Sequence, residues 1–383
     1  MEMVPYSHQW IDSFDIETVI KTLRSGWLTQ GPKIKEFEKA ICKYTGAKYA
    51  VVVSNGTSAL HLAVLAAGIN IKDEVITSPI TFVASANCVL YCGGIPVFAD
   101  IEEDCANISP DRIKEKVNRH TKALIPVHFS GLPCEMKTIY EIAKKNDLVI
   151  IEDAAHALGA EYARLKIGSC KYSDMAIFSF HPVKSITTGE GGAITTNNRN
   201  FYEKILLFRN HGITKEKSNF LNKPSGYWYH EMQLLGFNYR ISDIQSALGL
   251  SQLKKIDMFI EKRKRIADIY NKTFRGNPYF TVQSLREGIS SSYHLYPIEL
   301  NDNYKMKKES IFLKMQNVGL GVQVHYIPVY LQPYYKRLGY KKGLCPLAED
   351  FYEREISIPL YPQMSVKTVN NVIKRIFSVF KNI

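Results

Sequence analysis

A single lysine, Lys184, lies between an apolar stretch and a glycine-rich turn in FSFHPVKSITTGEGGAITT. Its neighbours include Phe178, Phe180 and Val183. An amine held among apolar side chains has a lowered pKa and is a nucleophile suited to Schiff-base chemistry. Most lysines, however, lie on exposed surface turns. Lys184 is therefore a candidate catalytic residue only if other residues point to the same chemistry.

Two hydroxyl residues, Thr57 and Ser58, follow Asn55 and Gly56 where a predicted strand gives way to a predicted helix. Free N–H groups at a helix start, a glycine that lets backbone approach closely, and hydroxyl groups together suit an anion such as phosphate. Simple N-capping of the helix produces the same residue types. The stretch is thus compatible with a phosphate site and does not prove one.

A pair of carboxylates, Glu152 and Asp153, ends the apolar run of LVIIEDAAHALGA. Open α/β sheets bind their ligands beyond the carboxyl ends of the strands. Asp153 is therefore a candidate partner for a cationic ring nitrogen of a cofactor. A helix N-cap or a metal ligand explains Asp153 equally well on this stretch alone.

Taken together, a phosphate cradle, a strand-end carboxylate and a lysine beside a glycine-rich turn are the three anchors of pyridoxal phosphate (PLP). In this interpretation Lys184 holds the cofactor and moves a proton, while Asp153 keeps the pyridine nitrogen protonated. Phe82, in SPITFVASAN, is a candidate to stack on the cofactor ring, although a core phenylalanine is the alternative.

The elements that must position these residues alternate along the first half of the chain. From about residue 35 to 200, short apolar runs are separated by helical patterns such as those over 57–69 and 136–147. This order predicts an α/β fold with a large, mostly parallel sheet covered by helices. The expected strands are YAVVVSN, EVITSP, IPVFADI, ALIPVHFSG, LVIIEDAAH, MAIFSF and GGAITT.

The pattern changes after Arg240. A long helix is expected from Ser242, which is a good N-cap, and this helix should connect two domains. We expect a PLP-binding domain over residues 1–245 and a smaller C-terminal α+β domain over residues 246–383, because a chain of 383 residues is long for one core. Strands are expected near YHLYPIEL and VQVHYIP.

A final helix is expected from Ser365. Its basic flanks leave open a membrane-surface role, but packing on the small domain is the favoured interpretation. The apolar residues expected on one face are Val369, Ile373, Ile376, Phe377 and Phe380.

Composition excludes several classes of protein. No apolar run reaches the ~18–20 residues of a membrane span, and the N-terminus does not resemble a signal peptide, so a cytoplasmic location is expected. The seven cysteines are scattered without metal-ligand spacing, so no metal is expected. The net charge of +12 suits a diphosphate substrate, and no nucleic-acid-binding motif accompanies it.

The ordered motifs resemble the DegT/DnrJ/EryC1/StrS family of sugar-nucleotide aminotransferases, which have the fold-type-I fold of PLP-dependent transferases. The resemblance covers nearly the whole chain and implies a homodimer with shared active sites. The motifs are SGWLTQGPKIKEFEKAI, SNGTSALHLAV, SPITFVASAN, EDAAHALGAEY, FSFHPVKSITTGEGGAITT, LFRNHGI, GFNYRISDIQSALGLSQL and VHYIPVY.

The resemblance also assigns roles to residues. Lys184 and Asp153 are the implied catalytic pair. His156 occupies a position where many family members have glutamine, and Asn238 should reach the cofactor phosphate of the neighbouring subunit. The implied cofactor-binding residues are Thr57, Ser58, Phe82, Asp153, His156, Ser179, Lys184 and Asn238. The implied substrate-binding residues are Tyr6, Thr29 and His325.

Within this family the chain is most similar to the transaminases of pseudaminic acid biosynthesis, through stretches such as NPYF, YHLYPI and AEDFYEREISIPLYP. That resemblance implies transfer of an amino group from L-glutamate to C4 of a UDP-linked 4-keto-6-deoxy-N-acetylhexosamine. Other nucleotide-linked keto sugars, of bacillosamine or perosamine type, remain alternatives. A sugar dehydratase would carry histidine in place of Lys184, and a non-enzymatic regulator would lack the PLP anchors.

Overall fold

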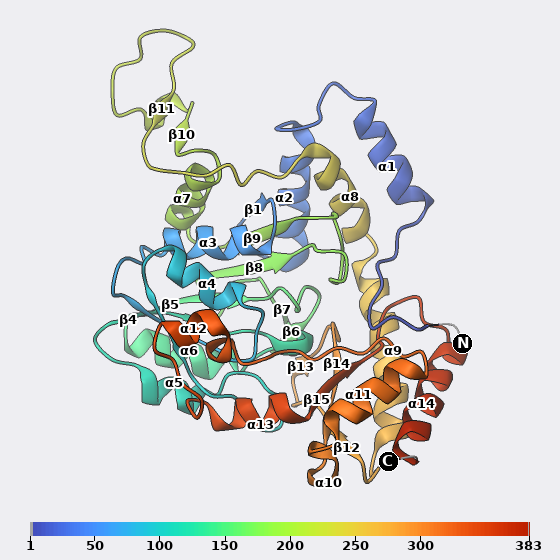
Figure 1. Cartoon of the computed structure of the whole chain (residues 1–383). Helices are drawn as coiled ribbons and strands as arrows, with labels where there is room; N and C mark the ends of the chain where they lie inside the picture. Colours follow the sequence, from blue (N-terminus) through green and yellow to red (C-terminus); the bar gives the residue numbers. More distant parts are fainter. Residues whose placement is uncertain (1–2, 382) are drawn as a thin grey trace.

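A seven-stranded sheet forms the centre of the larger part of the molecule (Figure 1). The computed structural model describes residues 3–381 and 383. In order across the sheet, the strands are β1 (Tyr49–Val53), β9 (Gly192–Thr196), β8 (Met175–Ser179), β5 (Val149–Asp153), β4 (Thr121–Ile125), β2 (Glu74–Thr77) and β3 (Ile95–Phe98).

The sheet is mostly parallel, as predicted, and β9 alone of its strands runs against its neighbours. Because β1 and β8 are both antiparallel to β9, they point the same way as each other. The carboxyl ends of β1, β2, β5 and β8 therefore meet at one edge of the sheet. Asp153 ends β5 and Ser179 ends β8, so the strand directions alone bring these two residues to that edge.

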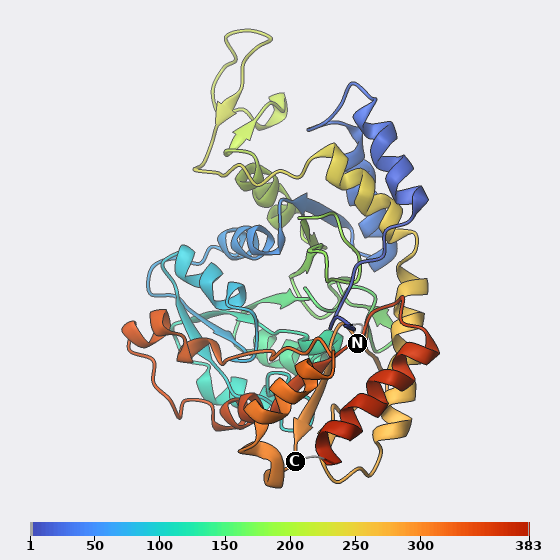
Figure 2. The same ribbon diagram turned by 45° about the vertical axis from the view of Figure 1, so that its right-hand side comes forward.

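Helices pack on both faces of this sheet (Figures 1 and 2). One of them, α3, packs on β8 and β9 and on two other helices, and almost every residue in it is buried. A helix that is apolar all round is expected in such a position. The helices of this part are α1 (Ser13–Leu23), α2 (Pro32–Thr45), α3 (Gly56–Ala66), α4 (Ala84–Tyr91), α5 (Pro110–Lys116), α6 (Met136–Lys145), α7 (Arg199–Arg209) and α8 (Asp243–Leu253).

The predicted long helix is two helices. Ser242 caps α8 as expected, but α8 ends at Leu253 and α9 begins at Ile256. Lys254 and Lys255 lie between them, and the side chain of Lys255 contacts Asp12 and Asp15 at 2.8 and 2.6 Å. The break lets α8 pack on α1 and α2 while α9 extends to the smaller part of the molecule.

The smaller part has its own antiparallel sheet and its own apolar core. Strands were expected near YHLYPIEL and VQVHYIP; the first contains β14, whereas the second makes only an isolated bridge between Gln323 and Ser357. The elements are α9 (Ile256–Phe274), β12 (Phe280–Val282), β14 (Tyr296–Leu300), α10 (Asp302–Lys305), α11 (Lys308–Asn317), β15 (Glu355–Ile358) and α14 (Val366–Lys381).

The final helix, α14, packs on this core as favoured. Val369, Ile376 and Phe380 are buried, whereas Val366 is exposed. The apolar face is therefore covered by protein, and a membrane-surface helix is not needed to explain it. None of the helices formed by residues 3–381 combines the length and the apolar character needed to cross a membrane.

The chain passes between the two parts more than once. Val4 belongs to the core of the smaller part, whereas Tyr330, Tyr335 and Phe351 pack with Phe98 in the larger part. The proposed boundary at residue 245 remains a prediction. The segments of this crossing are η3 (Val329–Leu331), α12 (Pro333–Arg337) and α13 (Pro346–Arg354).

A two-stranded arm projects from the larger part, at the top of Figure 1. It contains β10 (Ile213–Thr214), the short helix η2 (Lys217–Asn219) and β11 (Glu231–Met232). Trp228 on this arm is 77% exposed, and Tyr227 is more exposed still. The small remaining elements are η1 (Phe129–Gly131), β6 (Glu161–Tyr162), β7 (Leu165–Lys166) and β13 (Ile289–Ser290), with β13 pairing to β6.

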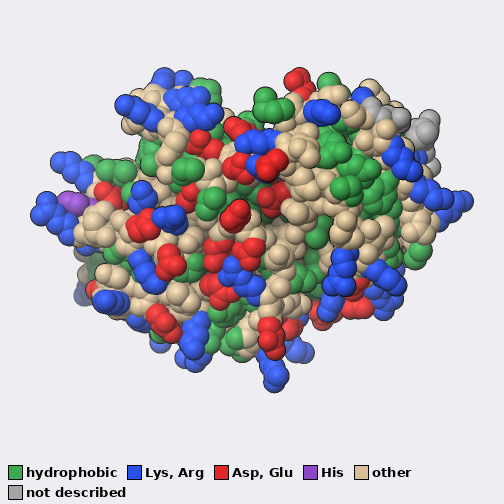
Figure 3. Space-filling view, turned by 90° about the horizontal axis from the view of Figure 1, so that it is seen from below, with side chains coloured by type: hydrophobic (Ala, Val, Ile, Leu, Met, Phe, Trp, Pro, Cys, Tyr) green, Lys and Arg blue, Asp and Glu red, His purple; other side chains and the backbone are tan. Residues whose placement is uncertain are grey.

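The surface charge is mixed on the face shown in Figure 3. Lysine and arginine side chains are interspersed there with aspartate and glutamate, and apolar side chains lie between them. On this face the net positive charge is therefore spread out and does not form one continuous basic surface.

Candidate active site

A cavity of about 510 Å³ opens at the edge of the sheet where the carboxyl strand ends meet. Its walls come from β5, β8, the start of α3 and the segment that returns from the smaller part. The sequence-predicted residues that line it are Tyr6, Thr57, Phe82, Asp153, His156, Ser179, Lys184 and His325. The fold thus collects residues from positions 6 to 325 of the chain around one space.

Asp153 is held by hydrogen bonds at the base of this cavity. Its Oδ2 accepts a hydrogen bond from Ser85 Oγ at 2.5 Å, and its Oδ1 accepts one from the backbone N–H of Ala155 at 3.1 Å. Thr81 Oγ1 lies 2.6 Å from Ser85 Oγ, so a chain of hydroxyls supports the carboxylate. Burial raises the pKa of Asp153, and the hydrogen bond from Ser85 opposes that effect.

Lys184 lines the cavity with its amine surrounded by protein. Burial lowers its pKa to about 8, and the charge of Asp153 partly opposes the shift. Its Nζ lies 3.5 Å from Nε2 of His294. With a pKa of about 8, about one molecule in ten carries the deprotonated amine at pH 7, against far fewer for an exposed lysine, and the deprotonated amine is the form required of a nucleophile or a base.

The start of α3 forms one part of the cavity wall, beside Ser179. Gly56 and Thr57 line the cavity, whereas Ser58 is buried behind them and pairs its hydroxyl with Ser54 at 3.0 Å. A Cβ atom on Gly56 would lie 2.9 Å from Cβ of Ser179, so glycine keeps this corner open. Asn55 caps the helix through the backbone N–H of Ser58.

Two aromatic rings and a histidine form the opposite side. Phe82 is 59% exposed and its ring lies 6.5 Å from that of Tyr326. The hydroxyl of Tyr326 lies 3.3 Å from Nε2 of His156. Burial keeps the pKa of His156 well below its usual value, so its ring is neutral. Nδ1 of His156 is buried and has no hydrogen-bond partner among the residues that the structure describes.

Tyr6 and His325 form the side of the cavity nearest the smaller part, with ring centres 5.8 Å apart. Nδ1 of His325 lies 2.8 Å from Oγ of Ser357, at the end of β15. Burial lowers the pKa of His325 to about 3, with a further contribution from the positive charge of Lys184. This imidazole is therefore neutral as well.

Three predicted residues do not line the cavity: Ser58, Thr29 and Asn238. Thr29 and Asn238 are exposed, and each makes an isolated bridge, to Ser242 and Asn210 respectively. Arg209 and Arg240, which could be expected to bind a donor carboxylate, also lie outside the cavity wall. Arg209 pairs with Glu38 at 2.7 Å, and Arg240 donates to the side chain of Asn210.

Ser85, His294 and Tyr326 were missed by the sequence interpretation, although each contacts a predicted residue. Ser85 is three residues after Phe82 in the same short stretch, so its position in the sequence could have indicated that it lies near the site. His294 and Tyr326 carry no local signal, because tertiary folding alone brings them to Lys184 and His156.

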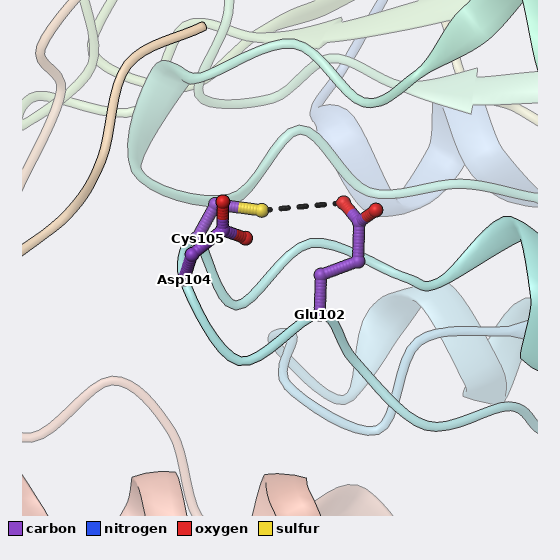
Figure 4. Close-up of side chains that lie close together, drawn as sticks. All are labelled: Glu102, Asp104 and Cys105. Atoms are coloured by element: carbon purple, nitrogen blue, oxygen red, sulfur yellow. Dashed lines mark hydrogen bonds between the residues drawn. The ribbon is translucent and has the colours of Figure 1, made fainter.

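A second group of polar side chains, Glu102, Asp104 and Cys105, lies outside this cavity (Figure 4). Cys105 Sγ donates a hydrogen bond to Glu102 at 3.3 Å. Arg286 bonds both carboxylates, at 3.2 Å to Glu102 and 3.0 Å to Asp104. The same arginine lies 3.2 Å from Glu135, so its single positive charge is shared among three carboxylates.

Residues 9–377 match the DegT/DnrJ/EryC1/StrS aminotransferase family. The chain belongs to this family. The predicted fold-type-I architecture and the prediction of an aminotransferase are therefore confirmed.

Individual members of the aminotransferase family match over their full length. The UDP-4-amino-4,6-dideoxy-N-acetyl-beta-L-altrosamine transaminase of Campylobacter jejuni (serotype O:2) is 42% identical over 386 residues, covering 100% of this chain and 98% of the relative. The solved structure of PseC from Helicobacter pylori, an aminotransferase involved in the biosynthesis of pseudoaminic acid, is 37% identical with a TM-score of 0.93 and covers 100% of both chains. The PLP form of Spr1654 from Streptococcus pneumoniae is 30% identical, with a TM-score of 0.92 and 99% of both chains covered.

The residues of this aminotransferase's cavity fit PLP. The open corner at Gly56, at a helix start, suits the phosphate, and the buried carboxylate of Asp153 suits a cationic ring nitrogen. The orphaned Nδ1 of His156 leaves a buried polar atom that a ring substituent would satisfy. The lowered pKa of Lys184 completes the set.

Proposed function

We propose that this aminotransferase uses PLP to move an amino group from L-glutamate to C4 of a UDP-linked 4-keto-6-deoxy-N-acetylhexosamine, giving UDP-4-amino-4,6-dideoxy-N-acetyl-beta-L-altrosamine for pseudaminic acid biosynthesis. The observation that carries the PLP chemistry is the meeting of Lys184, Asp153 and the α3 start around one cavity. The choice of sugar is supported by the names of the Campylobacter and Helicobacter relatives.

Each proposed role follows from the surroundings of a side chain. PLP, when bound, supplies an electron sink for the carbanion that forms next to nitrogen. Asp153, as a buried carboxylate, keeps a ring nitrogen protonated, and Lys184 holds and moves a proton at its Nζ. Thr57 and Ser179 face the phosphate corner, while Ser58 supports it from behind through Ser54.

The open side of the cavity suits the remaining ligand groups. Phe82 presents an exposed ring for stacking, and His156, beside Tyr326, offers a neutral nitrogen. Tyr6 and His325 face the space left for the sugar. Thr29 lies outside this wall, so its proposed contact needs the nucleotide to extend beyond the cavity.

We further propose a homodimer in the cytoplasm whose subunits share their active sites. Asn238 is exposed and bridges to Asn210, shortly before the arm that carries Tyr227 and Trp228 begins. Large exposed aromatic side chains are typical of protein interfaces. Asn238 is thus available to the cofactor phosphate of a second subunit.

The absorption spectrum tests the PLP proposal. Purified protein with added PLP should show the visible band of lysine-bound cofactor, and L-glutamate should abolish it. Lys184→Ala should lack the band and turnover while keeping its fold, and Lys171→Ala, which removes an exposed lysine, should behave like the unmodified protein. A protein without any band would support the regulator instead. A band insensitive to glutamate would exclude glutamate as the donor.

The sugar requires a separate measurement. The glutamate-treated enzyme should aminate the UDP-linked 4-keto-6-deoxy-N-acetylhexosamine faster than bacillosamine-type or perosamine-type keto sugars, as followed by mass spectrometry. Pocket contacts of ~1–3 kcal/mol correspond to roughly 10–200-fold discrimination. Faster amination of another sugar would replace the proposed substrate and leave the PLP chemistry unaffected.

A further inference from the structure

A hydrogen-bonded chain leads from the cavity into the smaller part of the molecule. Nδ1 of His325 lies 2.8 Å from Oγ of Ser357, and Ser357 Oγ lies 2.5 Å from Oε1 of Glu355. The backbone N–H of His325 donates to the other carboxyl oxygen, Oε2, at 2.8 Å. Glu355 and Ser357 are fully buried, so water does not compete for these bonds.

Ser357 has one hydroxyl proton and two partners, which couples the states of those partners. When Glu355 is ionised, Ser357 donates to it, and Nδ1–H of His325 donates to Ser357. Nε2 then reaches the cavity as an acceptor. When Glu355 is protonated, it donates to Ser357, Ser357 donates to Nδ1, and Nε2–H reaches the cavity as a donor.

The charges around Glu355 come from several elements. Burial is the main cause that raises its pKa to about 8. The hydrogen bonds from Ser357 and from the backbone N–H of His325, and the charge of Lys308 on α11, oppose this shift, and Glu299 on β14 adds to it. Burial raises the pKa of Tyr326, and the charge of Glu355 adds a smaller contribution. His325 itself stays neutral, because burial and the charge of Lys184 lower its pKa. Near neutral pH these surroundings favour the protonated carboxyl.

We propose that Glu355 and Ser357 are positioning residues that make Nε2 of His325 a hydrogen-bond donor to an acceptor oxygen of the substrate. This inference rests on the proposed function, because a nucleotide-linked keto sugar offers carbonyl and phosphate oxygens, which only accept hydrogen bonds. A neutral imidazole N–H orients such an oxygen without adding a second positive charge next to Lys184.

Raising the pH removes one proton and reverses the direction of the hydrogen bonds that join Glu355, Ser357 and His325. The proton on Nε2 leaves into the cavity, the Ser357 proton moves to Nδ1, and the Glu355 proton moves to Ser357 Oγ. The negative charge appears on the buried carboxylate. Nε2 becomes an acceptor and faces an acceptor oxygen of the substrate, so binding should weaken above the pKa of Glu355.

Replacing Glu355 with glutamine should keep Nε2 of His325 as a hydrogen-bond donor at every pH. The amide oxygen still accepts from the backbone N–H of His325, and the amide N–H donates to Ser357 at every pH. A matched control is Glu309→Gln, which removes an exposed carboxylate on α11 beside Lys308. Ser357→Ala breaks the chain by a second route if Glu355→Gln does not fold.

The tautomer is read by nitrogen NMR of resting protein labelled at histidine, with the His325 signals assigned from a His325→Gln variant. From about pH 6 to about pH 9, unmodified protein and Glu309→Gln should change from Nε2–H to Nδ1–H. Glu355→Gln should keep Nε2–H throughout, and Ser357→Ala should lose the pH dependence. A His325 tautomer that changes neither with pH nor in Glu355→Gln would overturn the coupling.

Kinetics test whether the substrate uses this donor. The KM for the keto sugar should rise about tenfold across the same pH range in unmodified protein and stay flat in Glu355→Gln, while kcat changes less. Equal KM profiles in the two proteins would overturn the role toward substrate. The NMR measurement needs no substrate, so it tests the hydrogen-bonded chain by itself. Failure of the proposed function would appear separately, as absent turnover in the unmodified protein.

Discussion

Nζ of Lys184 lies 3.5 Å from Nε2 of His294, a residue 110 positions later in the chain. Burial, with a further contribution from the positive charge of Lys184, keeps the pKa of His294 well below its usual value, so the ring is neutral. Its Nδ1 is buried without a hydrogen-bond partner in the described part of the chain. The roles of the two ring nitrogens depend on the tautomer: with the ring proton on Nδ1, Nε2 offers a lone pair that stabilises the ammonium form of Lys184.

His294→Phe should lower the pKa of Lys184 further below about 8 because this acceptor is lost while burial remains. The expected shift is up to about 1 pH unit. It is measured as the pH midpoint of PLP binding to cofactor-free protein. His61→Phe, which changes a buried histidine on α3, should leave the midpoint in place. A midpoint that moves upward in His294→Phe would contradict the assignment of Nε2 as acceptor.

Ser85→Ala should move the acid limb of the kcat/KM profile upward by about 1 pH unit. The ionised form of Asp153 is the one proposed to act, and the Ser85 hydroxyl stabilises it against burial. Without that bond the pKa of Asp153 rises, so activity is lost at a higher pH on acidification. The pH profile of Ser246→Ala, a buried serine on α8, is the control. An unchanged acid limb in Ser85→Ala would show that Asp153 does not set it.

The sequence predicts the residues at the carboxyl ends of the strands better than the residues that pack around them. The parallel strands are buried on both faces and read as apolar runs, so the end of β5 at Asp153 is visible in the sequence. Lys184 is visible through its apolar neighbours. His294 and Glu355 are not visible, because each reaches the site only through tertiary contacts. The break between α8 and α9 has no Gly or Pro to signal it.

Asn238→Ala should weaken PLP binding if subunits share their sites. We expect a dissociation constant raised about 10- to 150-fold, since one hydrogen bond to a charged phosphate is worth about 1.5–3 kcal/mol. Titration with PLP measures it, and sedimentation checks that the dimer persists. Asn303→Ala, at an exposed position on α10, is the matched control. An unchanged constant in a protein that is still dimeric would count against the shared site.

Arg263 fixes the backbone behind the cavity from α9. Its side chain is 1% exposed, and its NH1 donates to the backbone carbonyls of Tyr293, His294 and Leu360 at 3.0–3.3 Å. Burial lowers its pKa to about 10, so the guanidinium stays charged at neutral pH. One side chain thus joins the turn that carries His294 to the segment after β15.

Arg263→Met should lower the free energy of unfolding by about 2–4 kcal/mol, because three buried carbonyls lose their donor and methionine fills only part of the volume. Arg265→Met, two residues along the same helix, removes an exposed arginine that pairs with Glu261 and should cost less than about 1 kcal/mol. Thermal unfolding of the two variants side by side measures the difference. Equal losses of Tm would mean that the buried guanidinium contributes no more than a surface one. A larger loss in Arg263→Met, together with a displaced His294, would link the stability of α9 to the site of Lys184.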